Sequence, residues 1–356
     1  MDADPWYDPL RTYDENYTEG PFGAFMDGRR HEERGEPTHR FLGHEVYLPF
    51  GIPAGPLLNS RYMRAAFENC FDLAVYKTVR TRAYPSHPFP NVLAVHVEGD
   101  LTMDGARTSP LVADTNFVEP ISITNSFGVP SQEPYVWQND FQKAARYAKK
   151  GQVAILSFMG TAEDGLGRSA LIDDYVHAAK LAGDTGASVL EVDLSCPNIG
   201  KSGLVCYDLE MTHDIGEGAR SVIGSTPLIL KVGYYEDDVA LRRLAEVADT
   251  FGGALASINT IQATVVDRGG KQVLPGVSRK QSGICGASIA WAGLDMTRRL
   301  SHIRTEHRMD FEIIGIGGVM NVDDYRAYKD AGADAVMSAT GAMWNGNLAR
   351  EIKNSV

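Results

Sequence analysis

Short apolar segments alternate with longer amphipathic segments along most of the chain, from about residue 45 onward. Eight segments are short and rich in aliphatic and β-branched residues, which is typical of buried strands. They are VYLPFGI (46–52), DLAVYKT (72–78), QVAILSF (152–158), SVLEVDL (188–194), PLILKVG (227–233), ALASIN (254–259), FEIIGIGG (311–318) and DAVMSAT (334–340). The pattern therefore predicts eight strands.

Amphipathic helices are predicted between several of these strands. Their sequences are LIDDYVHAAKLAGDTG (171–186), DDVALRRLAEVADTFG (237–252), SIAWAGLDMTRRLSHIRTEH (288–307) and NVDDYRAYKDAGA (321–333). Each ends near a glycine, a basic residue or a turn, as helix C-termini do. Strands that alternate with helices form right-handed βαβ units and a parallel sheet. Eight such units close most economically into a (β/α)8 TIM barrel of the α/β class, and a doubly wound open sheet is the alternative.

Two regions depart from this rhythm. Residues 80–150 separate the second and third strands, which is too long for one helix, and the segments NVLAVHVEG (91–99) and ISITNSFGVPSQEP (121–134) predict an inserted hairpin and loop over the barrel mouth. Residues 1–44 combine charged and aromatic residues with little periodicity. We therefore expect an N-terminal arm over 1–44, packed on one barrel domain over 45–356.

Composition and charge narrow the classes of function. The chain has 356 residues and a formal net charge of −12. This charge argues against nucleic acid as the main partner, because binding to phosphates depends on basic patches. The N-terminus lacks the basic and apolar regions of a secretory signal, and no segment reaches the roughly 18 apolar residues of a membrane span. We expect a cytoplasmic protein that binds neither nucleic acid nor membranes.

The cysteines do not form a recognisable metal site. Cys70, Cys196, Cys206 and Cys285 make no C-x-x-C pair, and no cluster of histidines accompanies them. Because zinc sites need such spacings, no metal is predicted. A cysteine at the end of a buried strand can still be a small packing residue or a catalyst.

Polar residues follow several predicted strands at the ends where barrel enzymes place their active groups. They are Lys77, Cys196 with Asn198, Lys231, Asn259 with Thr260, and, from the insertion, Asn125 with Ser126. A single lysine after a strand is usually a solvated strand end. Polar residues at four successive strand ends instead suit an anionic cofactor and a substrate rich in amide groups.

Glycines follow the last strands. GIGGVM (315–320) and SATGAM (338–343) come after the seventh and eighth strands, and SGICGAS (282–288) precedes a predicted helix. Barrels often bind phosphate after strands seven and eight, through backbone amides at helix N-termini. Tight turns explain the glycines equally well, and no Rossmann G-x-G-x-x-G pattern is present.

These segments together make the chain resemble the dihydroorotate dehydrogenases, which are flavin mononucleotide (FMN) enzymes on a (β/α)8 barrel. The segments that carry the resemblance are LPFGIPAG (48–55), YKT (76–78), TNSFGVP (124–130), LSCPN (194–198), LILKVG (228–233), SINT (257–260), GICGA (283–287), IIGIGG (313–318) and SATGAMW (338–344). They follow the family's order and cover about residues 45–353.

The resemblance implies an FMN site and a catalytic set. The residues implied at FMN are Ala54, Gly55, Lys77, Thr78, Lys231, Gly286, Gly317, Gly318, Ala339 and Thr340. The implied catalytic residues are Cys196, Lys77 and Lys231. Cys196 matches the base of the soluble class and would take the proton from C5 of dihydroorotate while a hydride leaves C6 for flavin N5. Lys231 would neutralise negative charge at flavin N1 and O2. Cys70, Cys206 and Cys285 are expected to be packing residues.

The resemblance also implies a substrate site. Its residues are Lys77, Asn125, Phe127, Gly128, Val129, Asp193, Asn198, Asn259 and Thr260. The asparagines and Thr260 fall where the family hydrogen-bonds the pyrimidine ring. The backbone of the SFGVP segment (126–130) would meet the substrate carboxylate near Lys77.

Asp193 departs from the family's pattern, which has an asparagine in contact with the pyrimidine at this position. An amide both donates and accepts hydrogen bonds, whereas an ionised carboxylate only accepts. It also repels the carboxylate of orotate in a partly desolvated pocket. Four interpretations stay open: Asp193 is protonated, is paired with a nearby lysine, recognises a more donor-rich substrate, or faces the barrel wall in an ion pair.

The predicted function is FMN-dependent oxidation of (S)-dihydroorotate to orotate. The arm is too polar for the quinone tunnel of the membrane-bound class, and KSGLVCYDLE (201–210) is closer to the soluble, fumarate-using class. The resemblance thus implies a small-molecule substrate, fumarate as a soluble electron acceptor, and a homodimer. One alternative is a flavoenzyme for another dihydropyrimidine or cyclic amide. The other is a non-catalytic flavin-binding barrel, against which the complete set of Lys77, Cys196 and Lys231 argues.

Overall fold

The eight predicted strands form a closed parallel barrel. The computed structural model describes residues 5–26, 35–163, 165, 167–195, 204–251 and 253–356. Within them the barrel strands follow the predicted chain order: β3 (Phe50–Ile52), β4 (Leu73–Val79), β8 (Val153–Phe158), β9 (Val189–Asp193), β10 (Leu228–Val232), β11 (Ala254–Ser257), β14 (Glu312–Ile316) and β15 (Ala335–Met337). The barrel closes where Val336 of β15 pairs with Phe50 of β3. The predicted TIM barrel is confirmed, and the open sheet is excluded.

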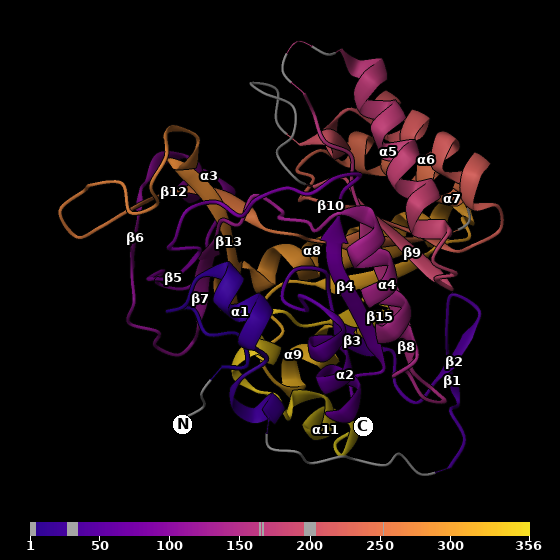
Figure 1. The fold of residues 1–356 in the computed structure, drawn as a ribbon, viewed down its shortest axis with the longest axis horizontal. Coiled ribbons are helices and arrows are strands. Elements are labelled where there is room, and N and C mark those ends of the chain that lie inside the picture. The colour runs from indigo at the N-terminus through magenta and orange to yellow at the C-terminus, as the bar shows by residue number, and fades with distance from the viewer. Residues whose placement is uncertain (1–4, 27–34, 164, 166, 196–203, 252) are drawn as a thin grey trace.

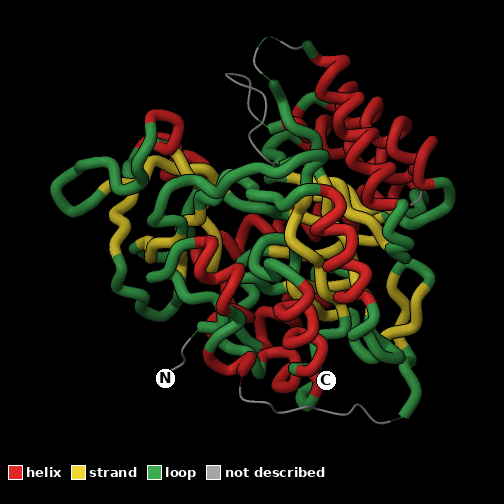
Figure 2. Tube along the Cα trace, viewed as in Figure 1, coloured by secondary structure: helices red, strands yellow, loops and turns green. Residues whose placement is uncertain are grey.

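Helices surround this barrel (Figures 1 and 2). They are α2 (Ser60–Glu68), α4 (Pro134–Ala145), α5 (Arg168–Gly183), α6 (Leu209–Ile223), α7 (Asp238–Phe251), α8 (Ala290–His307), α9 (Val322–Asp330), α10 (Thr340–Trp344) and α11 (Leu348–Lys353). The four helices predicted from amphipathic segments correspond to α5, α7, α8 and α9. Helices α5, α6 and α7 pack side by side on one side of the barrel. No helix of the described residues is long and apolar enough to cross a membrane.

The interior of the barrel changes from apolar to polar along the strands. Alternate residues of parallel strands share one face, and here the inward positions near the strand starts are aliphatic. Val75, Ile155 and Val189 are fully buried there, in a cluster separate from the larger core under the helices. Further along the same alternation come Glu191 and Asp193 on β9, and both are buried. Polar chemistry is thus concentrated toward the carboxyl ends of the strands.

A second, smaller closed barrel stands beside the first one. Its strands are β5 (Val92–Val95), β6 (Leu111–Asp114), β7 (Ser122–Asn125), β12 (Ile261–Val266) and β13 (Gln281–Gly286), and α3 (Met103–Thr108) lies between β5 and β6. The sequence predicts only a hairpin and loop in 80–150. The structure instead has three strands and α3 before α4, and α4 belongs to the outer layer of the large barrel. Strands β12 and β13 come from a separate insertion after β11.

The N-terminal arm packs against the large barrel. It contains α1 (Tyr13–Glu19), a 3-10 turn (Gly23–Met26) and a hairpin of β1 (His39–Phe41) and β2 (His44–Val46). Trp6 is fully buried, stacks on Phe25 with 4.7 Å between ring centroids, and donates from Nε1 to the Ala342 carbonyl oxygen. The arm is thereby fixed to α10.

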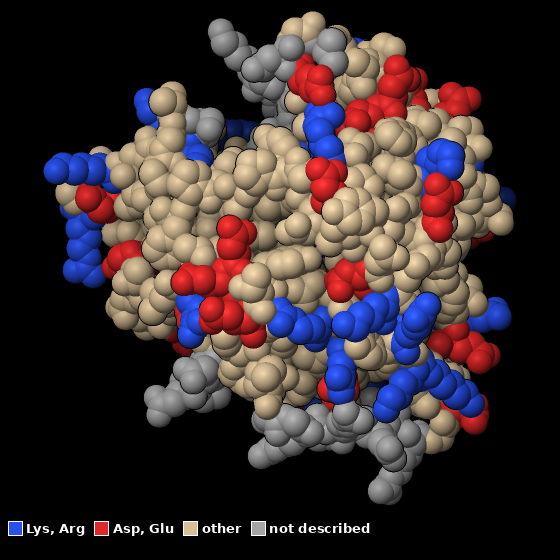
Figure 3. All heavy atoms as spheres, viewed as in Figure 1, with Lys and Arg blue, Asp and Glu red and all other residues tan. Residues whose placement is uncertain are grey.

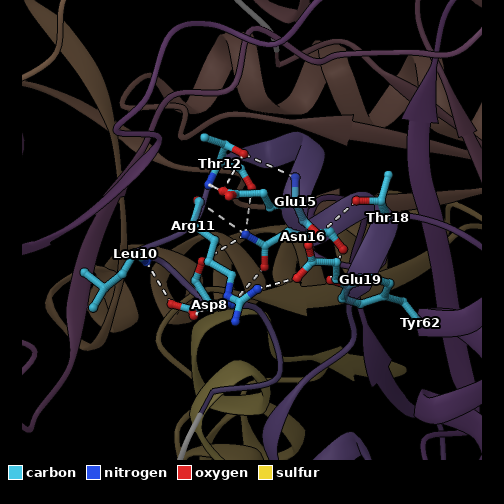
Figure 4. A network of polar contacts seen from close by, with 9 residues as sticks. All are labelled: Asp8, Leu10, Arg11, Thr12, Glu15, Asn16, Thr18, Glu19 and Tyr62. Carbon is cyan, nitrogen blue, oxygen red and sulfur yellow. Dashed lines mark hydrogen bonds and ion pairs between the residues drawn. The ribbon is translucent and has the colours of Figure 1, made fainter.

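Polar contacts hold the start of α1 in place (Figure 4). The Thr12 side chain and the Glu15 carboxylate cap the helix reciprocally, since each accepts from the other's backbone N–H. The Asn16 amide donates to the Asp8 carbonyl oxygen at 2.9 Å, and Tyr62 of α2 donates to the Asn16 carbonyl oxygen at 2.8 Å. These bonds join the arm to the helical layer.

On the face drawn in Figure 3, acidic and basic side chains are interspersed among neutral ones. Among the exposed ion pairs, Arg168 contacts Asp208 at 2.6 Å. One pair is buried instead: Lys353 of α11 reaches Asp72, just before β4, at 2.8 Å. Asp72 is fully buried, so this contact attaches the C-terminal helix to the base of the barrel.

Candidate active site

A cavity of about 420 Å³ lies at the carboxyl ends of the large barrel's strands and reaches the second barrel. This volume is in the range of small-molecule sites. The large barrel and the segments that follow its strands contribute Lys77, Thr78, Asp193, Lys231, Asn259 and Thr260, while the second barrel contributes Asn125, Gly283 and Cys285. The predicted polar residues therefore come together around one space.

Two lysines approach this cavity from different strands. Lys77 ends the inward alternation of β4 and is 7% exposed, and Lys231 on β10 is 3% exposed. The Lys231 ammonium donates to the Ala54 carbonyl oxygen at 3.0 Å. Burial of an ammonium group is costly unless it is hydrogen-bonded or meets an anion. These lysines therefore favour a ligand with negative charge.

The segment after β3 forms an open part of the cavity wall. Pro53, Ala54, Gly55 and Pro56 all line the cavity. At Gly55 a side chain would meet no atom within 4 Å, so the backbone faces open space. A planar ring system can approach such a wall closely, and Lys231, bonded to Ala54, stands at its edge. The donors and the shape present here fit a flavin.

Glu191 is a buried acid below the cavity. Its side chain is fully buried on the inward face of β9, and neither carboxyl oxygen has a hydrogen-bond partner within the described residues. Burial raises the pKa of this carboxyl, the nearby Lys231 opposes the rise, and Asp193 adds to it. These surroundings therefore shift the carboxyl toward its protonated form relative to an exposed glutamate.

Asp193 is held by the residue two positions further on. Its Oδ1 accepts from the Ser195 N–H at 3.0 Å and from the Ser195 hydroxyl at 2.7 Å. Among the described residues it forms no ion pair with a lysine, although Lys231 is its neighbour in the strand register. The second oxygen, Oδ2, accepts no hydrogen bond from the described residues, so it can accept one from an N–H group of a ligand.

Residues 126–129 close another side of the cavity. Ser126, Phe127, Gly128 and Val129 line it, and the rings of Tyr7 and Tyr13 from the arm meet the Phe127 ring edge-on at 5.7 and 5.9 Å. Gly128 has a φ of 75°, and a Cβ there would lie 2.6 Å from the His87 ring. Only glycine fits this position, because the conformation and the ring both exclude a side chain.

Three predicted cofactor residues do not line the cavity: Gly286, Gly317 and Gly318. Gly318 has a φ of 66°, and a Cβ there would lie 2.5 Å from that of Ala290 at the start of α8. A tight turn against α8 accounts for this glycine, and its phosphate role stays a prediction. Ala54, Gly55, Ala339 and Thr340 do line the cavity. Cys196 and Asn198 lie outside the described residues.

Sequence reasoning missed several residues of the cavity wall, among them Tyr7, His87, Arg279 and Cys285. Cys285 was expected to be a packing residue, but its sulfur accepts from the Asn125 amide at 3.4 Å and from the Thr340 hydroxyl at 3.6 Å. Burial raises the pKa of this thiol. Its place in the GICGA segment was the available signal. Tyr7 and Arg279 reach the cavity only through the tertiary fold, and nothing in their local sequence indicates it.

Comparisons with known proteins agree with this architecture. Residues 108–356 match the family described as "Dihydroorotate dehydrogenase". A dihydroorotate dehydrogenase of Dictyostelium discoideum is 33% identical over 370 residues, which cover 99% of this chain and 97% of the relative. The catalytic subunit of dihydroorotate dehydrogenase B (NAD(+)) from Listeria welshimeri is 30% identical over 171 residues, or 47% of this chain and 53% of that one.

A solved structure gives the same picture of the fold. Dihydroorotate dehydrogenase of Eimeria tenella, in complex with ferulenol, superposes with a TM-score of 0.69 and 18% identity, covering 91% of this chain and 85% of the other. At this identity the likeness concerns the fold alone. The family match and the nearly full-length relative carry the assignment. The chain therefore belongs to the dihydroorotate dehydrogenase family, whose members are oxidoreductases that act on a CH–CH bond.

Proposed function

We propose that this protein oxidises (S)-dihydroorotate to orotate with FMN bound in the cavity. The observation that carries the proposal is the cavity wall itself, in which two buried lysines line the same space as the amide and hydroxyl groups of Asn125, Asn259 and Thr260. Dihydroorotate presents a carboxylate and two ring amides. The wall offers a hydrogen-bonding or charged group for each of them.

The residues present suit FMN. Ala54 and Gly55 would lie along the ring system, Lys77 and Thr78 beside it, and Ala339 and Thr340 toward its phosphate chain. When bound, FMN supplies the acceptor for the hydride that leaves C6 of the substrate. Lys231, fixed to the Ala54 carbonyl oxygen, would place its positive charge where the reduced ring gathers negative charge.

This chain's residues would bind the substrate and move its proton. Lys77 and the 126–129 backbone would hold the carboxylate, and Asn125, Asn259 and Thr260 would hydrogen-bond the ring amides. Cys196 would take the proton from C5, which leaves the C5–C6 double bond of orotate once the hydride has departed. The role of Cys196 rests on its place in LSCPN, because the residue lies outside the described part of the chain. A thiol with an ordinary pKa near 8.5 can serve if its surroundings favour thiolate.

The remaining expectations concern the protein's context. We infer that fumarate reoxidises the enzyme, on the strength of KSGLVCYDLE, and that the enzyme is a homodimer of the soluble class. Within the described residues, Cys206 and Cys285 form no disulfide bond. Reoxidation by added fumarate and the solution mass test the first two points.

A second substrate is favoured by one observation. Asp193 holds Ser195 with Oδ1, and its Oδ2 can only accept while it is ionised. A ring with more N–H donors at this edge, such as another dihydropyrimidine or cyclic amide, would suit it better than orotate does. Dihydroorotate stays our first proposal because of the lysines.

Anaerobic mixing tests both substrates. The purified protein should absorb near 450 nm, a wavelength characteristic of oxidised flavin, and dihydroorotate should bleach that absorbance. Bleaching by another dihydropyrimidine, with dihydroorotate inert, would select the second candidate. A colourless protein that takes up no added FMN would refute both.

A further inference from the structure

Arg279 is a buried cation in the cavity wall, and neutral oxygens occupy its guanidinium group completely. It precedes β13 and is 3% exposed. Nη1 donates to the Pro88 and Pro275 carbonyl oxygens at 2.7 and 3.1 Å, and Nη2 to those of Pro90 and Ser126 at 2.7 and 3.0 Å. Nε donates to the Ser126 hydroxyl at 3.0 Å. Since arginine has five N–H donors, none is left for a ligand.

Arg80 fixes the other end of the same segment. It follows β4 and is 2% exposed. Its Nε donates to the Val129 carbonyl oxygen at 2.9 Å and Nη2 to that of Gly128 at 3.1 Å. The Phe127 carbonyl oxygen accepts from the His87 N–H at 2.9 Å. All four carbonyls from Ser126 to Val129 are therefore bound to donors from surrounding segments.

Three backbone N–H groups of this segment, unlike its carbonyl groups, are not bound to other parts of the described chain. Within the described residues, the N–H groups of Phe127, Gly128 and Val129 have no hydrogen-bond partner, although these residues line the cavity. Gly128 and Val129 both have positive φ values, 75° and 51°. Successive unpartnered backbone N–H groups in a turn can form an anion-binding concavity.

The charged side chains around this concavity are mostly positive. Neither Arg279 nor Arg80 forms an ion pair within the described residues, although buried cations are costly without one. The described part of the cavity wall carries three cationic side chains, Lys77, Lys231 and Arg279. It carries one carboxylate, that of Asp193. Burial lowers the pKa of His87, and the charges of Arg279 and Arg80 lower it further, so the histidine adds no charge near neutral pH.

We propose that Arg279, with Arg80, is a positioning residue that turns segment 126–129 into a carboxylate site, and that Arg279 thereby makes the cavity select a ring with a carboxylate over the same ring without one. The inference rests on the proposed function and deepens it. Arg279 acts through the backbone and through its charge, because its own donors are all engaged.

Orotate and uracil test this, because they share the pyrimidine ring and differ by the carboxylate. Calorimetry on the protein as purified should show that Arg279→Gln weakens orotate binding about 10- to 100-fold, the size of a unit-charge interaction across roughly 6 to 10 Å in a protein site. Uracil binding should change less than about threefold. Arg268→Gln is the matched control, because Arg268 is 80% exposed in the same β12–β13 connection and pairs only loosely with Asp114 at 3.5 Å. It should leave both affinities unchanged.

Arg279→Lys separates charge from geometry. It keeps the charge but cannot span the carbonyls of Pro88, Pro90 and Ser126, so orotate affinity should fall between wild type and Arg279→Gln. If the glutamine variant fails to fold, loss of orotate binding without loss of uracil binding in the lysine variant still supports the proposal. Equal weakening of both ligands, or unchanged orotate binding, overturns it. Absence of orotate binding to the wild-type protein overturns the proposed function as well.

Discussion

Replacement of Trp6 measures how strongly the arm is bound. Trp→Ala at a fully buried site costs about 3–5 kcal/mol through lost transfer energy and the cavity left behind. Within that cost, the stack on Phe25 accounts for about 0.5–1.5 kcal/mol and the bond to Ala342 for a similar amount. Trp6→Phe keeps an aromatic ring but loses the N–H donor, so it should cost about 1–2 kcal/mol.

Urea unfolding followed by circular dichroism gives the free energies, and tryptic cleavage after Arg11 reports release of the arm. Trp6→Ala should lower the midpoint and speed this cleavage, with Trp6→Phe in between. Leu10→Ala, at a 62% exposed position of the same arm, should stay within about 0.5 kcal/mol of wild type. If Trp6→Ala is as stable and as resistant to trypsin as wild type, the arm is not held through Trp6.

Four further predictions concern the site and the base of the barrel. Cys196→Ser should keep the 450 nm absorbance but slow bleaching by dihydroorotate severely near neutral pH, and an unchanged rate would remove Cys196 as the base. Asp193→Asn should speed that bleaching if the carboxylate repels the substrate, whereas slower bleaching would show that the acid already fits it. Because the pKa of Glu191 is raised in the folded state, the free energy of unfolding of the wild type should decrease as the pH rises from about 4.5 through that folded-state pKa. Glu191→Gln should lack this decrease when urea unfolding is repeated across pH. If the free energies of unfolding of wild type and variant change in parallel with pH, the pKa of Glu191 is not raised. Lys353→Met should destabilise by about 3 kcal/mol because buried Asp72 loses its cation, and Lys353→Arg should recover most of that in the same unfolding assay.

Periodicity predicted the large barrel well, because its strands are buried on both faces and its helices have one apolar face. The second barrel was harder to predict. Strands β12 and β13 alternate buried residues with exposed or half-exposed ones, and their partners β6 and β7 lie far away in the sequence. Pairing of that kind leaves no local signal, and SGICGAS (282–288) was interpreted as a phosphate-binding loop or a tight turn before a helix, not as a strand.

The same distinction separates the site residues. Lys77 and Lys231 were predictable because each ends an apolar run, and barrel geometry brings such ends together. Arg279 was not, because its function depends on carbonyls of Pro88, Pro90 and Ser126 that only the fold brings to it. The departure at Asp193 was visible in the sequence, and Ser195 two positions later was a readable signal for its hydrogen bonds.

The contacts that close the large barrel also fix the order in which the chain can fold. Trp6 bonds to Ala342, 336 residues away, β3 pairs with β15, and Asp72 meets Lys353. During synthesis the arm and β3 therefore emerge long before their partners exist, with one edge of β3 unpaired. Contacts of such high sequence separation form slowly, and an unpaired edge is prone to aggregation until it is covered. Closure of the barrel and docking of the arm are consequently late steps, and a nascent chain that ends before β15 has neither.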